Sequence, residues 1–350
     1  MKILILISSL EGGGSERIAT RVASALAERH EVHIMPFSVS KYPYPLSRNV
    51  RIDNAGLFDL RERKRFLLRL IISVFYGYFY LSIFRLRFRP DVTLSFLNKL
   101  NLLNAFAFFR GGRIVMSERN NPLMKGRGHF RLACLAYRFA DKVFFQSETV
   151  RSMFSDSIRR KGVVVPNPVE VDCKANGHSH KIVTVGRLKR QKNQESLIKA
   201  FAAFNNEHPG HTLHIFGKGE LENELRQLVS ELSLERSVFF EGFVTNVHEA
   251  IRDAEMFVLS SNYEGMPNAL LEAMMMGLPC VTTSYEGVEE LLGDSGCCLI
   301  VPVGDNLALA GAMARIAEEP QLRSLLSQKA TAFSERFTVD RVIPLWEKEL

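Results

Sequence analysis

Residues 1–37, MKILILISSLEGGGSERIATRVASALAERHEVHIMPF, contain an order of elements that recurs along the chain. The apolar run Ile3–Ile7 predicts a buried strand, and the glycines at 12–14 predict the turn after it. Apolar residues at helical spacing over Ile18–Glu28 predict a helix, and Glu31–Phe37 predicts the next strand. A strand, a glycine-rich turn, a helix and another strand are typical of an α/β fold with a parallel sheet.

The pattern restarts after VVVPNPV at residues 163–169, where two prolines around an asparagine predict a strand end and a break. We therefore expect an α/β fold of two tandem Rossmann-like, doubly wound domains that face a central cleft. The expected domains are residues 1–166 and 167–335, and a last helix over 336–350 crosses back to the first. The further predicted strands are Asp91–Phe96, Arg113–Ser117, Lys142–Gln146, Lys181–Val185, His211–Phe216, Val238–Glu241, Met256–Ser260, Leu278–Thr282 and Cys298–Val301.

Composition limits the class of protein. The chain has 350 residues, 46% hydrophobic and 24% charged, with a mean hydropathy of −0.01. These values exclude a disordered tail protein, a collagen-like repeat and a multi-span transporter. The five cysteines have no CxxC spacing, which argues against a disulfide framework and for a reducing compartment. The first apolar run is short and lacks a cleavage pattern, so a strand is favoured over a signal peptide.

Charge is distributed unevenly along the chain. The net charge is +7, but residues 1–168 carry 28 Lys/Arg and 12 Asp/Glu, whereas residues 169–350 carry 17 and 26. A basic first half indicates contact with a polyanion, and both an anionic membrane surface and nucleic acid are candidates. Scattered, solvated surface charge is the third explanation.

The segment Leu70–Phe84, LIISVFYGYFYLSIF, has no charged residue. Four arginines and a lysine precede it within residues 61–69, and three arginines follow it within residues 85–89. Fifteen residues are fewer than the roughly 20 that a membrane span needs. Aromatic residues with basic flanks suit a helix that lies in a lipid headgroup layer. A buried helix on the sheet is the alternative.

The sequence EGMPNALLE, residues 264–272, carries two glutamates at the end of a predicted strand. Asn268 is the expected helix N-cap, and Glu272 lies one turn further on the same face. The first amides of this helix would suit an anion such as phosphate. The two carboxylates could accept hydrogen bonds from the hydroxyls of a sugar and a ribose. Solvated glutamates at a helix end are the plain alternative.

The sequence GRLKRQKN, residues 186–193, lies between a predicted strand and a predicted helix. Arg187 and Lys192 could neutralise a diphosphate there, because α/β sheets bind ligands at the carboxyl ends of their strands. The glycines at 12–14 occupy the corresponding turn of the first domain. They do not form a dinucleotide fingerprint, since Arg17 stands at the position of its third glycine.

Together these motifs resemble glycosyltransferase family 4, whose members are retaining, nucleotide-sugar-dependent enzymes of GT-B architecture. The resemblance spans nearly the whole chain. Its motifs are the glycine turn before Glu16-Arg17, VPNPV at 165–169, GRLKRQKN at 186–193, IFGKGEL at 215–221, EGMPNALLEAMMMGLPCV at 264–281 and LIVPVGD at 299–305.

The resemblance implies roles for individual residues. Arg187 and Lys192 would hold the donor diphosphate, Glu264 would face the transferred sugar, and Glu272 would hold the ribose. Glu264, Arg187 and Lys192 are therefore the candidate catalytic residues. The other implied donor-binding residues are Gly14 from the first domain, Gly217, Phe243 and Val244 near the base, and Gly265, Met266, Pro267, Asn268 and Leu271.

The acceptor side departs from the family pattern. The family commonly has a histidine in the first domain near the reacting sugar, whereas this chain reads Ser117-Glu118-Arg119-Asn120, with Arg119 at the expected position. Glu118 and Arg119 thus become acceptor-side candidates. Helix capping or a structural ion pair would explain them equally well.

The implied reaction moves a hexose or N-acetylhexosamine from a UDP-sugar, with retention, to a hydroxyl of a polyprenyl-linked glycan in cell-surface polysaccharide assembly such as O-antigen. The stretch SFLNKLN from Ser95 points to that subgroup. We expect no cofactor and no metal, because no DxD run or His/Cys cluster offers a metal site. We expect a cytoplasmic protein, peripheral on the cytoplasmic face of the membrane.

Two other functions stay open. One is a non-catalytic nucleotide-sugar-binding protein, which an intact set of donor residues disfavours. The other is a nucleic-acid-binding α/β protein. It is disfavoured because the chain has no recognition motif and no aromatic residues interleaved with basic ones, so no nucleic-acid partner is expected.

Overall fold

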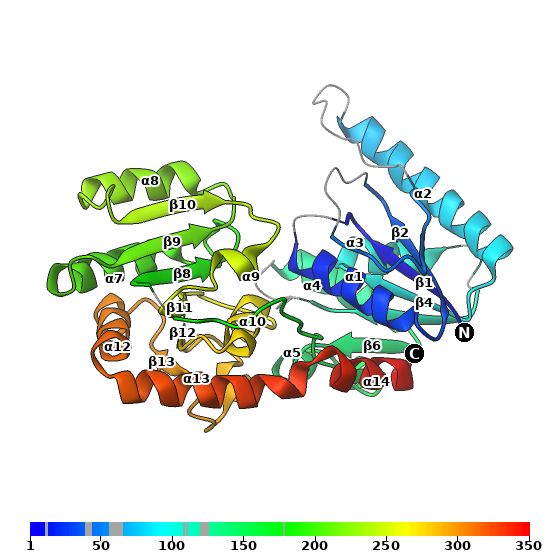
Figure 1. The fold of residues 1–350 in the computed structure, drawn as a ribbon. Coiled ribbons are helices and arrows are strands. Elements are labelled where there is room, and N and C mark those ends of the chain that lie inside the picture. The colour runs from blue at the N-terminus through cyan, green and yellow to red at the C-terminus, as the bar shows by residue number, and fades with distance from the viewer. Residues whose placement is uncertain are drawn as a thin grey trace. The chain divides into compact units, whose positions relative to one another are not determined.

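The computed structural model describes residues 1–10, 13–38, 44–55, 66–107, 109, 111–119, 126–177 and 179–350, with residues 66–74 as backbone only. The chain forms two compact units (Figure 1). Unit 1 is Met1–Pro168 with Val339–Leu350, and unit 2 is Val169–Thr338. These boundaries lie two and three residues after the predicted ones. The reason is that Val169 and Thr338 pair in a β-bridge, so both residues belong to unit 2.

Unit 1 is a seven-stranded parallel sheet in the order β3-β2-β1-β4-β5-β6-β7. The order reverses between β1 and β4, as in a doubly wound fold. Its strands are β1 Lys2–Ile7, β2 Glu31–Pro36, β3 Val50–Ile52, β4 Val92–Phe96, β5 Arg113–Ser117, β6 Lys142–Phe145 and β7 Gly162–Val164. Its helices are α1 Gly14–Leu26, α2 Phe66–Phe88, α3 Asn98–Phe106, α4 Arg127–Arg138, α5 Glu148–Ser152, α6 Asp156–Arg159 and α14 Val339–Glu349.

Unit 2 is a six-stranded parallel sheet in the order β10-β9-β8-β11-β12-β13. Its strands are β8 Lys181–Val185, β9 Thr212–Phe216, β10 Val238–Gly242, β11 Met256–Leu259, β12 Cys280–Thr283 and β13 Leu299–Val301. Its helices are α7 Gln194–Glu207, α8 Glu222–Glu231, α9 Val247–Ala250, α10 Asn268–Met276, α11 Val288–Leu292, α12 Asn306–Glu318 and α13 Pro320–Ser334, followed by the 3₁₀ turn Glu335–Phe337.

Both faces of each sheet are covered, which explains the continuous apolar strands. In β1, Ile3, Ile5 and Ile7 belong to a core with α1 and α14. The alternate residues Leu4 and Leu6 belong to a second core with α2 and α3. The prediction of two Rossmann-like parallel sheets is confirmed. The edge strand β3 was not predicted, because its sequence VRI is not a continuous apolar run. Strand β7 was predicted only by its end, in the VVVPNPV segment.

Helix α2 contains the predicted apolar segment and extends beyond it at both ends. Its inner side holds Leu81 and Arg85, both fully buried. Its outer side exposes five large apolar side chains, namely Phe75, Tyr76, Phe79, Ile83 and Leu86. The predicted basic flank over 61–65 lies outside the described residues. No helix in the described part of the chain is long and apolar enough to cross a bilayer.

Candidate active site

The candidate site of unit 2 lies where the strand order of its sheet reverses. Strands β8 and β11 are neighbours, and each is followed by a loop that carries a predicted motif, 186–193 after β8 and 260–267 after β11. Ligands of open parallel sheets bind at such a reversal, outside the carboxyl ends of the strands. The topology therefore brings together two motifs that are about 70 residues apart in sequence.

Hydrogen bonds join these two loops directly. The backbone N–H of Asn262 donates to the carbonyl of Gln191 at 2.8 Å, and the Asn262 side-chain amide donates to the carbonyl of Arg190 at 2.7 Å. The Ser260 hydroxyl donates to the carbonyl of Lys192 at 2.9 Å. Asn193 then starts α7 with a φ of 48°, a left-handed conformation that asparagine tolerates better than most residues. The loop bonds fix the position of Lys192.

Lys192 and Glu264 form an ion pair at the centre of the site. Lys192 Nζ lies 2.6 Å from Glu264 Oε1, and the two side chains are 19% and 6% exposed. The Ser261 hydroxyl donates to the same oxygen at 2.5 Å, and Gln191 Nε2 donates to Oε2 at 3.3 Å. Three donors thus hold a nearly buried carboxylate, as burial of a charge requires. Arg187, from the same loop, is exposed.

Gly217 closes the site from the end of β9. A Cβ at this position would lie 2.0 Å from the carbonyl oxygen of Gly186, and its φ is 137°. Only glycine allows this approach, so the loops after β8 and β9 are in direct backbone contact. The N–H of Gly217 donates to the carbonyl of Gly242 at 2.7 Å, which adds the turn after β10. In that turn Phe243 is exposed and Val244 half-buried.

The start of α10 differs from the prediction for Asn268. The N-cap is Pro267, and Asn268 is the first helical residue, with no side-chain cap bond at this end. The prediction was wrong because the turn needs one residue fewer than assumed. Helix geometry leaves the amides of Ala269 and Leu270 without intrahelical carbonyls. These amides could still serve the anion that the motif was expected to bind.

The other residues of this motif divide between core and site. Met266 and Leu271 are buried within the hydrophobic core, Pro267 is buried and Gly265 is half-buried. Glu272 is 3% exposed and lies on α10. Its Oε2 is 3.6 Å from Nε2 of His248, whose Nδ1 is 2.9 Å from Asp172 Oδ2. A buried carboxylate beside an imidazole is placed to accept hydroxyl donors.

Four side chains of this region were missed by sequence reasoning. Gln191, Ser261 and His248 contact the two glutamates, and Tyr285 lies buried near Glu264. Burial, with a smaller contribution from the Glu264 charge, raises the pKa of Tyr285. Gln191 and Ser261 lie next to or close to predicted residues, so proximity was a usable signal. His248 and Tyr285 lie on other elements, and nothing in their local sequence indicates the contact.

The remaining predicted residues lie in unit 1. Gly14 is exposed and begins α1, while Gly12 lies outside the described residues. Glu118 and Arg119 follow β5, and both are buried. The Tyr137 hydroxyl donates to Glu118 Oε2 at 2.8 Å. Burial, and then the Glu118 charge, raise the pKa of Tyr137 well above its usual value. Glu118 therefore has a structural partner whether or not it meets an acceptor.

Arg119 contacts Asn167, in the VPNPV segment at residues 165–169, and Trp346 on α14. Its Nη1 donates to Asn167 Oδ1 at 2.7 Å, and its guanidinium lies over the Trp346 ring at 4.5 Å. Burial lowers the pKa of Arg119 to about 9, which leaves the group charged at neutral pH. Its Nε and Nη2 have no hydrogen-bond partner among the described residues. These contacts give Arg119 a structural role, and Nε and Nη2 remain as donors without a described partner.

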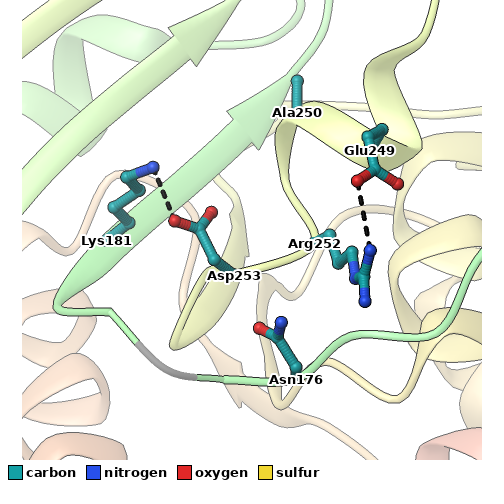
Figure 2. Close-up of a pocket in the computed structure, with 6 residues that line it drawn as sticks. All are labelled: Asn176, Lys181, Glu249, Ala250, Arg252 and Asp253. Atoms are coloured by element: carbon teal, nitrogen blue, oxygen red, sulfur yellow. Dashed lines mark hydrogen bonds and ion pairs between the residues drawn. The ribbon is translucent and has the colours of Figure 1, made fainter.

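A cavity of about 430 Å³ in unit 2 contains none of the predicted residues. It is lined by Asn176, Lys181, Glu249, Ala250, Arg252 and Asp253 (Figure 2). Its charges are paired, Lys181 with Asp253 at 2.7 Å and Arg252 with Glu249 at 3.2 Å. Lys181 begins β8 and Asp253 precedes β11, so the cavity lies at the amino ends of the strands, opposite Glu264. Paired charges give it no evident ligand.

Two family models match the chain, one in each unit. The model described as Glycosyltransferase Family 4 matches residues 12–172, and the model described as Glycosyl transferases group 1 matches residues 172–333. Between them they cover nearly all of both sheets.

Curated relatives match along the full chain. A Campylobacter jejuni protein named GalNAc-α-(1→4)-GalNAc-α-(1→3)-diNAcBac-PP-undecaprenol α-1,4-N-acetyl-D-galactosaminyltransferase is 27% identical, over 99% of this chain and 98% of its own length. A second enzyme of that organism, N-acetylgalactosamine-N,N′-diacetylbacillosaminyl-diphospho-undecaprenol 4-α-N-acetylgalactosaminyltransferase, is also 27% identical, over 96% and 95%.

Solved structures share the fold. Anabaena HepE, in a complex with UDP and glucose, has a TM-score of 0.82 at 20% identity, over 99% of this chain and 98% of that one. Sucrose-phosphate synthase from Thermosynechococcus elongatus has a TM-score of 0.84 at 16% identity, again over 99% and 98%. Family models, full-length relatives and fold agree, and the chain belongs to glycosyltransferase family 4, with GT-B architecture.

Proposed function

We propose that this glycosyltransferase moves a hexose or N-acetylhexosamine, with retention, from a UDP-sugar to a hydroxyl of a polyprenyl-diphosphate-linked glycan in cell-surface polysaccharide assembly, such as O-antigen. The observation that carries the proposal is the Lys192–Glu264 pair at the point where the strand order of unit 2 reverses. A cation and a carboxylate held 2.6 Å apart there can meet the two ends of one donor, its diphosphate and its sugar.

The chemistry follows from where charge develops. As the bond between the sugar and the diphosphate breaks, negative charge grows on the leaving phosphate and positive charge on the sugar. Lys192 has three N–H donors, so it can retain its ion pair with Glu264 and also bind the phosphate. Arg187 and the first amides of α10 would add to this stabilisation, which is greatest in the transition state. With these cations the proposed reaction needs no metal, and the acceptor attacks from the face that the phosphate leaves.

The acceptor is proposed from the relatives and from the charge of unit 1. Both Campylobacter jejuni relatives carry undecaprenol-linked diphosphate glycans in their names. In this chain the first 168 residues carry 28 Lys/Arg against 12 Asp/Glu. The two nitrogens of buried Arg119 without described partners, Nε and Nη2, suit a phosphate or sugar oxygen of such an acceptor.

The membrane surface is proposed from the outer side of α2 and its neighbours. Beside the five exposed apolar residues of α2, further ones lie at the end of α3 and on α4, and the three helices pack in succession. They are Phe106, Phe109, Leu132, Leu135 and Phe139. The exposed arginines Arg87, Arg131 and Arg138 lie on α2 and α4. Aromatic side chains with arginines suit an anionic headgroup layer, on the cytoplasmic face in this proposal.

We expect the double variant Phe75→Glu/Phe79→Glu to bind vesicles that contain anionic phospholipid at least ten-fold more weakly than the unmodified protein. Each aromatic ring that leaves water contributes roughly 1.5–3 kcal/mol, and the new carboxylates repel the lipid. Sedimentation with sucrose-loaded vesicles measures the partition.

The matched control is Leu307→Glu/Leu325→Glu, which changes two exposed leucines of unit 2 and should bind like the unmodified protein. Equal binding by the α2 variant and the control would remove α2 from the membrane contact.

The donor is tested by a thermal-shift panel of nucleoside diphosphates and their sugars, because a ligand of the folded state raises its apparent stability. The fold likeness to HepE recommends UDP as the first nucleotide. We expect UDP and one UDP-sugar to raise the melting temperature. Glu272→Gln should weaken the binding of each of these two ligands by about ten-fold.

NMR of the product should show the anomeric configuration of the donor. Binding without transfer would favour a non-catalytic protein, and an inverted product would overturn retention.

A further inference from the structure

Three potential metal ligands meet at the edge of the unit 2 sheet that lies opposite the candidate active site. His180, His211 and Glu255 each stand one residue before a strand, namely β8, β9 and β11. These strands are consecutive in the sheet and parallel, so their first residues share one edge. The residues are 31 and 44 positions apart in sequence, which is why no local motif indicates the cluster.

The distances suit a tetrahedral ion. His211 Nε2 lies 3.1 Å from Glu255 Oε2, and His180 Nδ1 lies 3.7 Å from the same oxygen. One ligand atom from each residue lies within 4.8 Å of the others. Two ligands that each lie about 2.0–2.1 Å from a tetrahedral zinc ion are separated by roughly 3.3 Å. The two observed distances lie on either side of that value.

The hydrogen bonds of His211 show which of its nitrogens is available. Nδ1 lies 3.2 Å from the backbone carbonyl of His208, so it carries a proton and donates. In the neutral ring Nε2 then has only a lone pair, and this faces the carboxylate oxygen of Glu255. Two lone pairs at 3.1 Å require a cation between them, either a proton or a metal ion. Metal-binding histidines typically donate their other N–H to a carbonyl or carboxylate in this way.

Neighbouring residues orient the Glu255 carboxylate, and one side of the cluster is open to solvent. The Glu255 side chain is 6% exposed, and Arg323 binds its other oxygen, Oε1, so that Oε2 points to the histidines. The His180 side chain is 74% exposed, so solvent reaches the cluster. An ion held here would have water as its fourth ligand, as an open zinc site does.

We propose that His180, His211 and Glu255 bind one Zn²⁺ or a similar first-row divalent ion at the amino edge of the unit 2 sheet. Two imidazoles and one carboxylate suit these ions and do not suit Mg²⁺, which prefers oxygen ligands. The ion would join β8, β9 and β11, and it would stabilise unit 2 without taking part in sugar transfer. The proposal does not depend on the donor or acceptor proposed above.

The test uses the full chain without an affinity tag, stripped with EDTA and dialysed. Titration with ZnCl₂ in a calorimeter should give one ion per chain and raise the melting temperature of unit 2, whereas MgCl₂ should do neither. His180→Gln and His211→Gln should each weaken Zn²⁺ binding at least ten-fold. Since His180 is exposed, its substitution leaves the fold intact.

His214→Gln is the matched control. His214 lies on β9, three residues after His211, and its side chain is about as exposed, but its ring contacts Glu241 and Thr212. Its substitution should leave Zn²⁺ binding unchanged. Three results would overturn the proposal: no Zn²⁺ binding, binding that both cluster variants retain, or binding lost equally in the His214 variant. In the first case NMR should find a proton on Nε2 of His211.

Discussion

Replacement of Lys192 by methionine is expected to lower kcat for sugar transfer by roughly 10²–10³-fold, the usual effect of removing one donor that stabilises transition-state charge. Methionine keeps most of the length and volume of lysine but not its charge. The variant therefore loses the proposed contact with the leaving diphosphate, and it also loses the 2.6 Å ion pair with Glu264. Initial rates with the UDP-sugar found by the thermal-shift panel measure the effect.

Two further variants separate these losses. Lys189→Met removes a charge from the same loop, at a residue whose side chain is not among the partners of Glu264, and it should keep activity within about two-fold. In the double variant Lys192→Met/Glu264→Gln, a neutral amide replaces the buried carboxylate, so no cation is needed beside it. If Lys192 only neutralised Glu264, this double variant would recover stability and would bind UDP as tightly as Glu264→Gln does. If Lys192 holds the diphosphate, stability recovers and UDP binding stays weak.

A rate for Lys192→Met that equals that of Lys189→Met would contradict the proposed function. Circular dichroism of each variant establishes that a loss of rate is not a loss of fold.

The sequence predicted the main contacts of this site because they depend on topology. Lys192 and Glu264 each follow a strand of one parallel sheet, so the strand order alone brings their loops together. The finer contacts depend on side-chain packing between loops. Ser261 and Gln191 reach Glu264 because the backbone and side-chain amides of Asn262 bind the carbonyls of residues 191 and 190. No local sequence pattern specifies this alignment of the two loops.

The same limit explains the results for helix starts and edge strands. Asn268 has the residue type of an N-cap, but the preceding Pro267 takes that place. Strand β3 has the sequence VRI, and its central arginine interrupts the apolar run by which the other strands were predicted. Long apolar strands and helices were predicted well because burial on both faces leaves a strong pattern.

Arg119 shows the limit most clearly. In the sequence it is a charged residue after a strand, which indicates solvent or a ligand. In the structure it is buried over the ring of Trp346, a residue 227 positions later in the chain. Arg119 is thus one of the basic residues of unit 1, and α14 shields it from water. We therefore expect the stability of this part of unit 1 to depend on α14.

Replacement of Trp346 by alanine is accordingly expected to lower the unfolding free energy of unit 1 by about 3–5 kcal/mol, the range for a fully buried aromatic side chain. The indole is 0% exposed and packs on Phe144 and Phe96 at 5.2 and 6.0 Å between ring centroids. Its Nε1 donates to the carbonyl of Pro166 at 3.0 Å, so the change also leaves a partly buried acceptor without this partner. The Arg119 guanidinium also loses its cation–π contact with the ring, which offsets part of the cost of burying its charge.

Urea unfolding followed by far-UV circular dichroism measures this effect, because Trp346 is the only tryptophan and its fluorescence is lost with it. Leu345→Ala, at a 47% exposed neighbour on the same helix, should change the free energy by less than about 0.5 kcal/mol. Trp346→Phe should fall between the two, since it keeps the ring contacts and loses the hydrogen bond. If Trp346→Ala unfolded at the same urea concentration as Leu345→Ala, α14 would be an accessory to unit 1 rather than part of its core, and Arg119 would need another explanation for its burial.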